Sequence, residues 1–287
     1  GVAVRAVLQI CHGVAEHIAR YDGFARALNE QGIVVAGHDH LGHGKSLPEG
    51  GTPVYFGEGN TWNTVVDDIY VLHQRLKQRY PDVPLCIMGH SMGSFLTRTY
   101  LIRYPGTVKA AVIMGTGWQP RAAITGGLAL ANAIAAVSGE NATSELVTEL
   151  AFGSYNKLFA PNRTKVDWLS ADESNVDDYI ADPLCGADAT VGLFRQMLHG
   201  IRFNQRQSHL RQMDREMPVL FVAGDKDPVG SCGKGVRQTY DAFRAAGMRD
   251  CTLKLYPGLR HEILNEKAYA ADITKDIEAW LLSRLEK

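Results

Sequence analysis

The chain has 287 residues, 45% of them hydrophobic and 21% charged, enough to bury one large core or two small ones. Its formal net charge of −1 at pH 7 gives no electrostatic reason to expect nucleic acid as a partner. Five cysteines without a C-x-x-C pair predict neither a disulfide framework nor a thiolate metal site, so we expect a reducing, cytoplasmic location.

Apolar segments alternate with amphipathic ones through the first part of the chain. Four segments are apolar on both faces: residues 7–11, 33–36, 85–88 and 110–114. Such segments are typical of strands buried in a parallel sheet. Apolar residues at helical spacing predict helices near residues 21–28 and 62–76, and Gly32 is placed to end the first of them. No basic segment or cleavage site of a signal peptide precedes the first strand.

The same alternation returns near the end of the chain. Residues 219–223 are again apolar throughout, whereas residues 251–256 alternate in polarity, with Lys254 between two leucines, as in a half-exposed edge strand. A closing helix is predicted over residues 273–281. The pattern therefore predicts an α/β fold with a mostly parallel sheet covered by helices on both faces.

A long interruption separates the fourth apolar segment from the fifth. About 100 residues lie between them, where a simple β-α-β crossover takes about 30. We assign the surplus to an inserted, mainly helical cap over residues 118–205, and the core to residues 1–117 and 206–287.

The first part of this insertion, residues 122–139, contains no charged residue. A transmembrane span needs about 20 strongly apolar residues, and this stretch is only weakly apolar and is interrupted by polar residues. Two interpretations stay open. It forms either a helix packed against its own domain or a mobile apolar lid that meets lipid or a membrane surface.

The motif G-H-S-M-G at residues 89–93 lies between an apolar strand and a helix with Phe95, Leu96 and Tyr100 on its periodic face. This arrangement predicts a nucleophile elbow, a strained turn that lifts the hydroxyl of Ser91 above the sheet. Glycines flank it because a Cβ there would collide with neighbouring backbone. The helix start below supplies free N–H groups and a positive dipole end. We therefore predict Ser91 as a nucleophile.

A serine nucleophile needs a base, and the base needs a third group to orient it. After a nucleophile elbow, the acid and then the histidine follow in chain order. His261 is the only histidine downstream of residues 219–223. Two acids follow that strand: Asp225 lies close to the strand end and can bind the turn, whereas Asp227 lies further out, before a proline. We predict His261 as the base and favour Asp227 as the acid.

An oxyanion hole needs two backbone N–H donors. The N–H of Met92, directly after the nucleophile, is one candidate. His12-Gly13 at the end of the first strand lets the backbone approach closely, which makes the N–H of Val14 the second candidate.

Together these motifs resemble those of the α/β-hydrolase family, and within it the monoacylglycerol lipase and lysophospholipase-like branch. The resemblance covers nearly the whole chain and rests on five segments: H-G-V-A-E-H at 12–17, H-D-H-L-G-H-G-K-S at 38–46, G-H-S-M-G at 89–93, G-D-K-D-P at 224–228, and His261. The resemblance implies Asp227 as the acid and Val14 as an oxyanion donor. Residues 159–185 resemble the cap of bacterial lysophospholipase-like members. The short hairpin that usually precedes the first strand in this family is missing from the sequence.

The expected activity is hydrolysis of carboxylic esters with medium or long acyl chains, through an acyl-enzyme and without a cofactor. The expected partner is a small-molecule or lipid ester, and the cap could contact a membrane or micelle transiently. A related serine aminopeptidase is one alternative, and it would need cap carboxylates to hold a substrate amine: Asp167, Asp172, Glu173, Asp177 and Asp178 are available. A low-turnover ligand-binding receptor of the same fold is another alternative.

A metal site is a further possibility that the sequence raises. Histidine and aspartate both ligate zinc, and four such residues lie close together: His38, Asp39, His40 and His43. Their spacing fits no zinc motif, and the same residues match a structural turn of the hydrolase branch. No dinucleotide loop or P-loop is present in the sequence, so we expect neither a metal nor a nucleotide.

Overall fold

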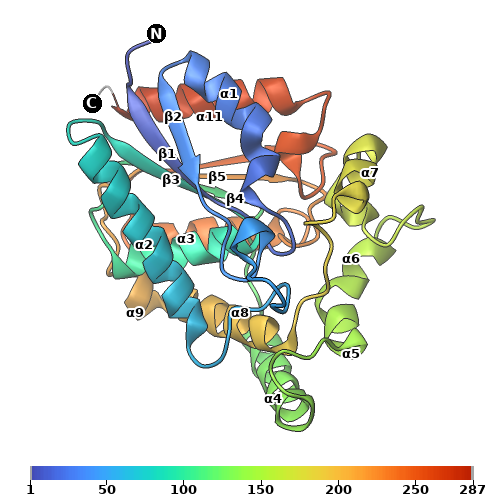
Figure 1. Ribbon diagram of the computed structural model, residues 1–287. Coiled ribbons are helices and arrows are strands. Elements are labelled where there is room, and N and C mark those ends of the chain that lie inside the picture. The colour runs from blue at the N-terminus through green and yellow to red at the C-terminus, as the bar shows by residue number, and fades with distance from the viewer. Residues whose placement is uncertain (1, 286–287) are drawn as a thin grey trace.

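Six strands form one sheet in the computed structural model, which describes residues 2–285 (Figure 1). The strands are β1 (Ala6–Cys11), β2 (Ile33–Gly37), β3 (Leu85–His90), β4 (Ala111–Met114), β5 (Val219–Gly224) and β6 (Cys251–Tyr256). Their spatial order is β2-β1-β3-β4-β5-β6, and every neighbouring pair is parallel. The described sheet is thus fully parallel rather than mostly parallel, and β6 is an edge strand as its alternating pattern predicts.

Helices cover both faces of this sheet. One face carries α1 (Asp22–Glu30) and α11 (Ala270–Leu285), which pack on side chains such as Leu220 and Val222. The other carries α2 (Thr61–Arg79), α3 (Met92–Arg103) and α10 (Lys234–Ala245), which pack on the alternate side chains such as Phe221. Because both faces are covered, the strands are apolar on both sides.

Most remaining helices lie between β4 and β5. They are α4 (Arg121–Ser138), α5 (Glu145–Thr148), the π-helical η3 (Glu149–Gly153), α6 (Ser154–Lys157), the 3₁₀ turn η4 (Asp167–Leu169), α7 (Glu173–Ala181), α8 (Val191–Asn204) and α9 (Gln207–Leu210). Three further 3₁₀ turns are η1 (Ile18–Tyr21), η2 (Gly44–Ser46) and η5 (Ile263–Asn265). Figure 1 shows α4 to α7 grouped outside the two helical layers that cover the sheet.

The helix α3 is buried on all sides, which corrects the expectation of a single periodic apolar face. Eleven of its twelve residues are buried. The reason is tertiary, since α8 covers the side of α3 that points away from the sheet. There the amide of Asn204 on α8 donates to the carbonyl of Phe95, and its Oδ1 accepts from the hydroxyl of Thr99.

The apolar helix α4 has two different faces. Ile124, Leu128 and Ala131 are buried, and Leu128 shares a cluster with residues of α8. Val137 is 88% exposed. By length and composition alone, α4 is the one helix within residues 2–285 that could span a membrane, yet only 17% of it is buried. One face therefore packs against the protein, and the other is an exposed apolar surface.

The turn between β3 and α3 has the strained geometry of an elbow. Ser91 has φ 53° and ψ −123°, a conformation that L-residues rarely adopt. A Cβ on Gly93 would overlap the carbonyl oxygens of Cys11 and His12, and a Cβ on Gly89 would overlap the backbone of Gly93. Both glycines are therefore required for close backbone packing around Ser91.

We expect Gly93→Ala to lower the free energy of unfolding by roughly 3 kcal/mol, because the new methyl group has no room beside β1. Gly126→Ala is the matched control, since Gly126 lies inside α4 and a methyl group added there would meet no atom within 4 Å. That control should gain about 0.5–1 kcal/mol from helix propensity. Urea unfolding of both variants measures the difference, and equal stability of Gly93→Ala and the unmodified protein would contradict the packing argument.

Candidate active site

Three of the predicted residues lie where strands end, at the same edge of the sheet. Ser91 follows β3, Asp227 follows β5 and His261 follows β6. Carboxyl ends of parallel strands meet at one edge, which is where sites form in such sheets. The Nδ1 atom of His261 lies 3.0 Å from Oδ2 of Asp227, and both side chains are almost fully buried.

The two candidate acids have different partners. Besides His261, Asp227 accepts a hydrogen bond from the backbone N–H of Val229 at 2.9 Å, which fixes its carboxylate. Asp225 instead accepts from the N–H of Gly258 at 2.8 Å, in the turn that follows β6. The structure therefore brings Asp227 to the histidine and places Asp225 in the turn.

The imidazole of His261 lies between two other rings. Its centroid is 4.6 Å from that of His90 and 5.1 Å from that of Trp168 on η4. A Cβ at Gly115 would lie 3.1 Å from atoms of both His261 and His90. A larger residue at this position would therefore crowd the two imidazole rings. No sequence pattern pointed to Trp168, because its position depends on how the insertion folds back over the core.

The loop after β1 holds its peptide groups in fixed orientations. The Nδ1 atom of His12 lies 2.7 Å from the carbonyl oxygen of Gly13, and Nε2 of His12 accepts from the N–H of His40. Burial lowers the pKa of His12 to about 3, so the ring is neutral with its proton on Nδ1. Since a trans peptide is planar, a fixed carbonyl of Gly13 also fixes the direction of the Val14 N–H. This is the preorganisation that an oxyanion donor requires.

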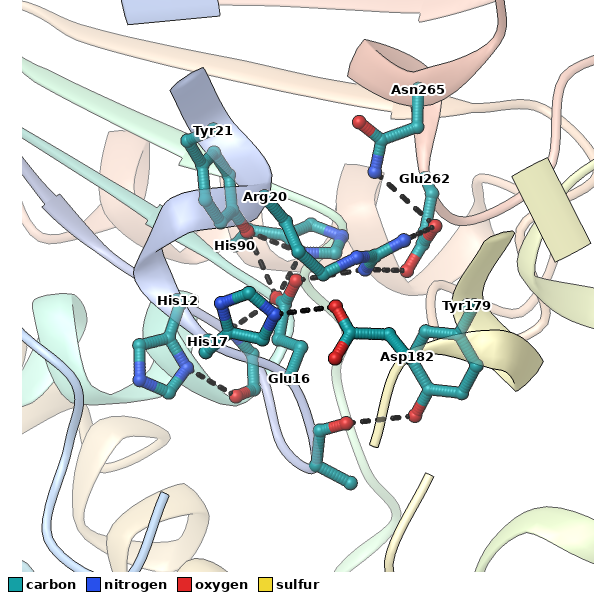
Figure 2. A network of polar contacts seen from close by, with 12 residues as sticks. His12, Glu16, His17, Arg20, Tyr21, His90, Tyr179, Asp182, Glu262 and Asn265 are labelled. Atoms are coloured by element: carbon teal, nitrogen blue, oxygen red, sulfur yellow. Dashed lines mark hydrogen bonds and ion pairs between the residues drawn. The ribbon is translucent and has the colours of Figure 1, made fainter. Parts of the chain in front are cut away.

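A buried carboxylate, Glu16, holds this loop from the other side (Figure 2). It accepts hydrogen bonds from the N–H of Gly13 at 2.5 Å, the hydroxyl of Tyr21 at 2.9 Å and the guanidinium of Arg20 at 3.0 Å. Burial alone would raise the pKa of Glu16, but the hydrogen bond from His90, its charge and the charge of Arg20 hold that pKa well below its usual range. Glu16 is therefore ionised.

The same arginine reaches the loop that carries the catalytic candidate His261. Arg20 donates two hydrogen bonds to Glu262, at 2.6 and 2.8 Å (Figure 2). Asn175 on α7 donates to the same carboxylate at 2.8 Å. The backbone N–H of Glu262 also donates to the carbonyl of Leu169 at 2.8 Å. Arg20 and Glu262 thus join the loop after β1, the loop after β6 and the inserted helices.

His90, beside Ser91, has an acceptor at each ring nitrogen. Its Nδ1 atom lies 3.2 Å from the Glu16 carboxylate, and its Nε2 atom lies 3.3 Å from the backbone carbonyl of His261. An imidazolium satisfies both, because both nitrogens then donate. Burial opposes this charge, yet the hydrogen bond and charge of Glu16 raise the pKa of His90. No sequence pattern indicated this network, although Glu16 lies within the H-G-V-A-E-H motif and Arg20 lies four residues further on.

The four residues considered for a metal lie in the loop after β2, where the histidines contact other rings and, within the described residues, both ring nitrogens of His38 and of His40 are buried without a hydrogen-bond partner. The rings of His12 and His40 lie 4.2 Å apart, and those of His38 and His40 lie 5.3 Å apart. Burial lowers the pKa of His38, His40 and His43. Asp39 accepts from the backbone N–H groups of Ile18 and Lys45. These contacts fold the loop against the one that carries Val14.

We expect Glu16→Gln to lower the free energy of unfolding by about 3 kcal/mol, because it leaves buried cations without their carboxylate. The depressed pKa of Glu16 adds stability above its ordinary value of 4.5, and this is lost as the pH falls through the folded pKa. The raised pKa of His90 adds stability below 6.5 that is lost as the pH rises through its folded pKa. The difference between the two proteins should therefore be largest between pH 4.5 and 6.5.

Chemical denaturation across the pH range measures this difference, and an NMR titration of the imidazole of His90 gives its pKa directly. Glu30→Gln, at an exposed position at the end of α1, is the control. If the difference in unfolding free energy between Glu16→Gln and the unmodified protein did not change with pH, the carboxylate would not hold the charge on His90. An unchanged pKa of His90 in Glu16→Gln would show the same.

Comparison with known proteins adds independent findings. The chain matches the family described as serine aminopeptidase, S33, over residues 2–268. It is 32% identical to a monoacylglycerol lipase of Mycolicibacterium smegmatis, over 98% of this chain and 89% of that protein. It is 27% identical to the human monoglyceride lipase, over 98% of this chain and 83% of that protein.

Solved structures agree with this relationship. A thermostable carboxyl esterase from Bacillus coagulans, crystallised with glycerol, superposes with a TM-score of 0.92 at 26% identity, covering 99% of this chain and 91% of the esterase. The sheet order, the elbow and these relatives agree with one another. The chain is a carboxylic ester hydrolase, and it belongs to the S33 serine aminopeptidase family of α/β-hydrolases.

Proposed function

We propose that the protein cleaves monoacylglycerols, or lysophospholipids of similar shape, that carry medium or long acyl chains. The buried pair of His261 and Asp227, 3.0 Å apart and at the same sheet edge as the strained Ser91, is the observation that carries the proposal. The lipases of bacterial and animal origin that resemble the chain over nearly its whole length support the substrate class.

The proposed reaction follows the acyl-enzyme route. Ser91 attacks the ester carbonyl while His261 takes the proton of its hydroxyl, and Asp227 stabilises the imidazolium that forms. The N–H groups of Val14 and Met92 stabilise the oxyanion. His261 then gives the proton to the leaving alcohol, and a water molecule hydrolyses the acyl-enzyme by the same steps in reverse.

The arrangement of cap carboxylates does not favour a peptidase. Asp167 accepts from the N–H groups of Arg163 and Thr164, and Asp172 accepts from the N–H of Ser174 at the start of α7. The other three form ion pairs: Glu173 and Asp177 with Arg163, and Asp178 with Lys267. All five carboxylates therefore already have partners, whereas a substrate amine would need a free one.

We propose that residues 118–205 act as a cap over a core formed by residues 1–117 and 206–287. Contact between Trp168 and the ring of His261 supports this role, because it places the insertion against the candidate base. We also propose that the exposed apolar face of α4 touches a membrane or micelle during substrate uptake. The five unpaired cysteines favour a reducing compartment such as the cytoplasm.

We expect Ser91→Ala to lower kcat/KM on a long-chain monoacylglycerol by roughly 10⁴-fold or more, because the triad acts as a unit. Asp227→Asn should lose a comparable amount, since only the acid bonded to His261 fixes its tautomer. Asp225→Asn is the matched control and should stay within about tenfold of the unmodified enzyme.

A fluorophosphonate probe distinguishes this activity from that of a contaminating esterase, because it should label the wild-type protein and not Ser91→Ala. Near-normal turnover by a Ser91→Ala preparation that the probe does not label would contradict the mechanism. A larger loss in Asp225→Asn than in Asp227→Asn would overturn the choice of acid. Activity on acetate esters without activity on long-chain monoacylglycerols would reject the substrate class.

For the membrane contact, we expect Val137→Ser to weaken binding to phosphatidylcholine vesicles about tenfold, because each methylene inserted in lipid contributes about 0.8 kcal/mol. Its melting temperature should not change, since Val137 is 88% exposed. Val71→Ser on α2 is the matched control, because Val71 is also exposed but lies outside the insertion. Equal vesicle binding by both variants, measured by co-sedimentation, would show that α4 does not contact the lipid.

A further inference from the structure

Three potential metal ligands of different chemistry meet where the loop after β1 contacts the insertion. They are the imidazole of His17, the carboxylate of Asp182 and the thiol of Cys185, and their ligand atoms all lie within 4.8 Å of one another. His17 is buried, and the other two are partly buried. We propose that these three side chains bind a zinc ion, or a similar divalent transition metal, which bridges the loop to the inserted helices.

The ligand set matches what zinc prefers. Zinc accepts nitrogen, oxygen and sulfur ligands in tetrahedral geometry, and sites with three protein ligands keep a fourth position open. The Nε2 atom of His17 is now 2.7 Å from Oδ2 of Asp182, and tetrahedral ligands lie roughly 3.3 Å apart. Side-chain movements of about 1 Å would therefore form the site. Oδ1 of Asp182 already accepts from the N–H of Leu184 at 2.9 Å, which orients the carboxylate.

The surrounding charges favour a cation. The carboxylates of Glu16 and Glu262 are buried next to this cluster, and Asp182 adds a third negative charge. Arg20 opposes a metal ion, and so does His90 when it is protonated. Two cations against three carboxylates leave one net negative charge around the cluster, where Asp182, with a side chain 30% exposed, already contacts His17.

The thiol of Cys185 must lose its proton before its sulfur can bind a metal as a thiolate. The thiol of Cys185 is free and partly buried. Zinc would replace this proton, which leaves to solvent, and a Zn–S bond would form without any oxidation. Binding should therefore strengthen as the pH rises.

If the protein has the proposed function, a metal at this position would affect catalysis. His17 lies three residues after Val14, and Ala15 between them accepts from the hydroxyl of Tyr179 and the N–H of Gly186, both at 2.9 Å. A metal held by His17, Asp182 and Cys185 would add a strong link between the loop with the oxyanion donor and the insertion. Zinc should therefore slow hydrolysis by limiting movement of the cap.

Cobalt(II) titration tests the site without any use of activity. Cobalt bound to a thiolate gives a charge-transfer absorption in the near ultraviolet, and we expect this band in the wild-type protein and not in Cys185→Ser. Calorimetric titration with zinc should show one site whose affinity falls at least about tenfold in Cys185→Ser. Cys232→Ser is the matched control, because Cys232 is an exposed free cysteine between β5 and α10 and should leave binding unchanged.

Absence of the band, or equal zinc affinity in Cys185→Ser and Cys232→Ser, would overturn the proposal. Zinc inhibition of ester hydrolysis that persists undiminished in Cys185→Ser would overturn the link to the cap, since the metal would then act elsewhere, for example on His261. The cobalt and calorimetric measurements need no substrate, so their outcome does not depend on the proposed ester specificity. A failure of the metal site can therefore be distinguished from a failure of the proposed function.

Discussion

The buried ion pair between Arg20 and Glu262 is the interaction on which the site depends most. Together with Glu16, it places three ionised side chains inside the protein, where removal of one partner typically costs about 3–5 kcal/mol. Such a network tolerates few alternative arrangements, because every carboxylate oxygen has a specific donor. It fixes the distance between the loop after β1, which carries Val14, and the loop after β6, which carries His261.

Strain at Ser91 is maintained by the packing around it. A positive φ at a serine costs of order 1–3 kcal/mol, and the close approach of Gly93 to the backbone of β1 prevents the turn from relaxing. His90 then bonds both Glu16 and the carbonyl of His261. The elbow, the first loop and the histidine loop thus form one rigid unit, whereas the exposed face of α4 lies outside it.

Specific contacts join the insertion to this rigid unit at the loop of His261. The ring of Trp168 lies against His261, and the guanidinium of Arg260 donates to the carbonyls of Asp167 and Ser170. Both contacts reach His261, the candidate base, and its loop rather than Ser91. A movement of the proposed cap would therefore first displace His261 and the loop around Ala15.

The sequence by itself determined the parallel sheet and the strained turn at Ser91, and it pointed to Asp227 and His261 as candidate acid and base, because these inferences depend on local periodicity and on motifs within a few residues. Only the tertiary structure showed that Glu16, Arg20 and Glu262 form one network, since their charges are indistinguishable from surface charges until distant loops meet. The same holds for α3, whose outer side is buried only because α8 folds over it, and for Trp168. Periodicity records which residues avoid water, but it does not record which distant segment shields them.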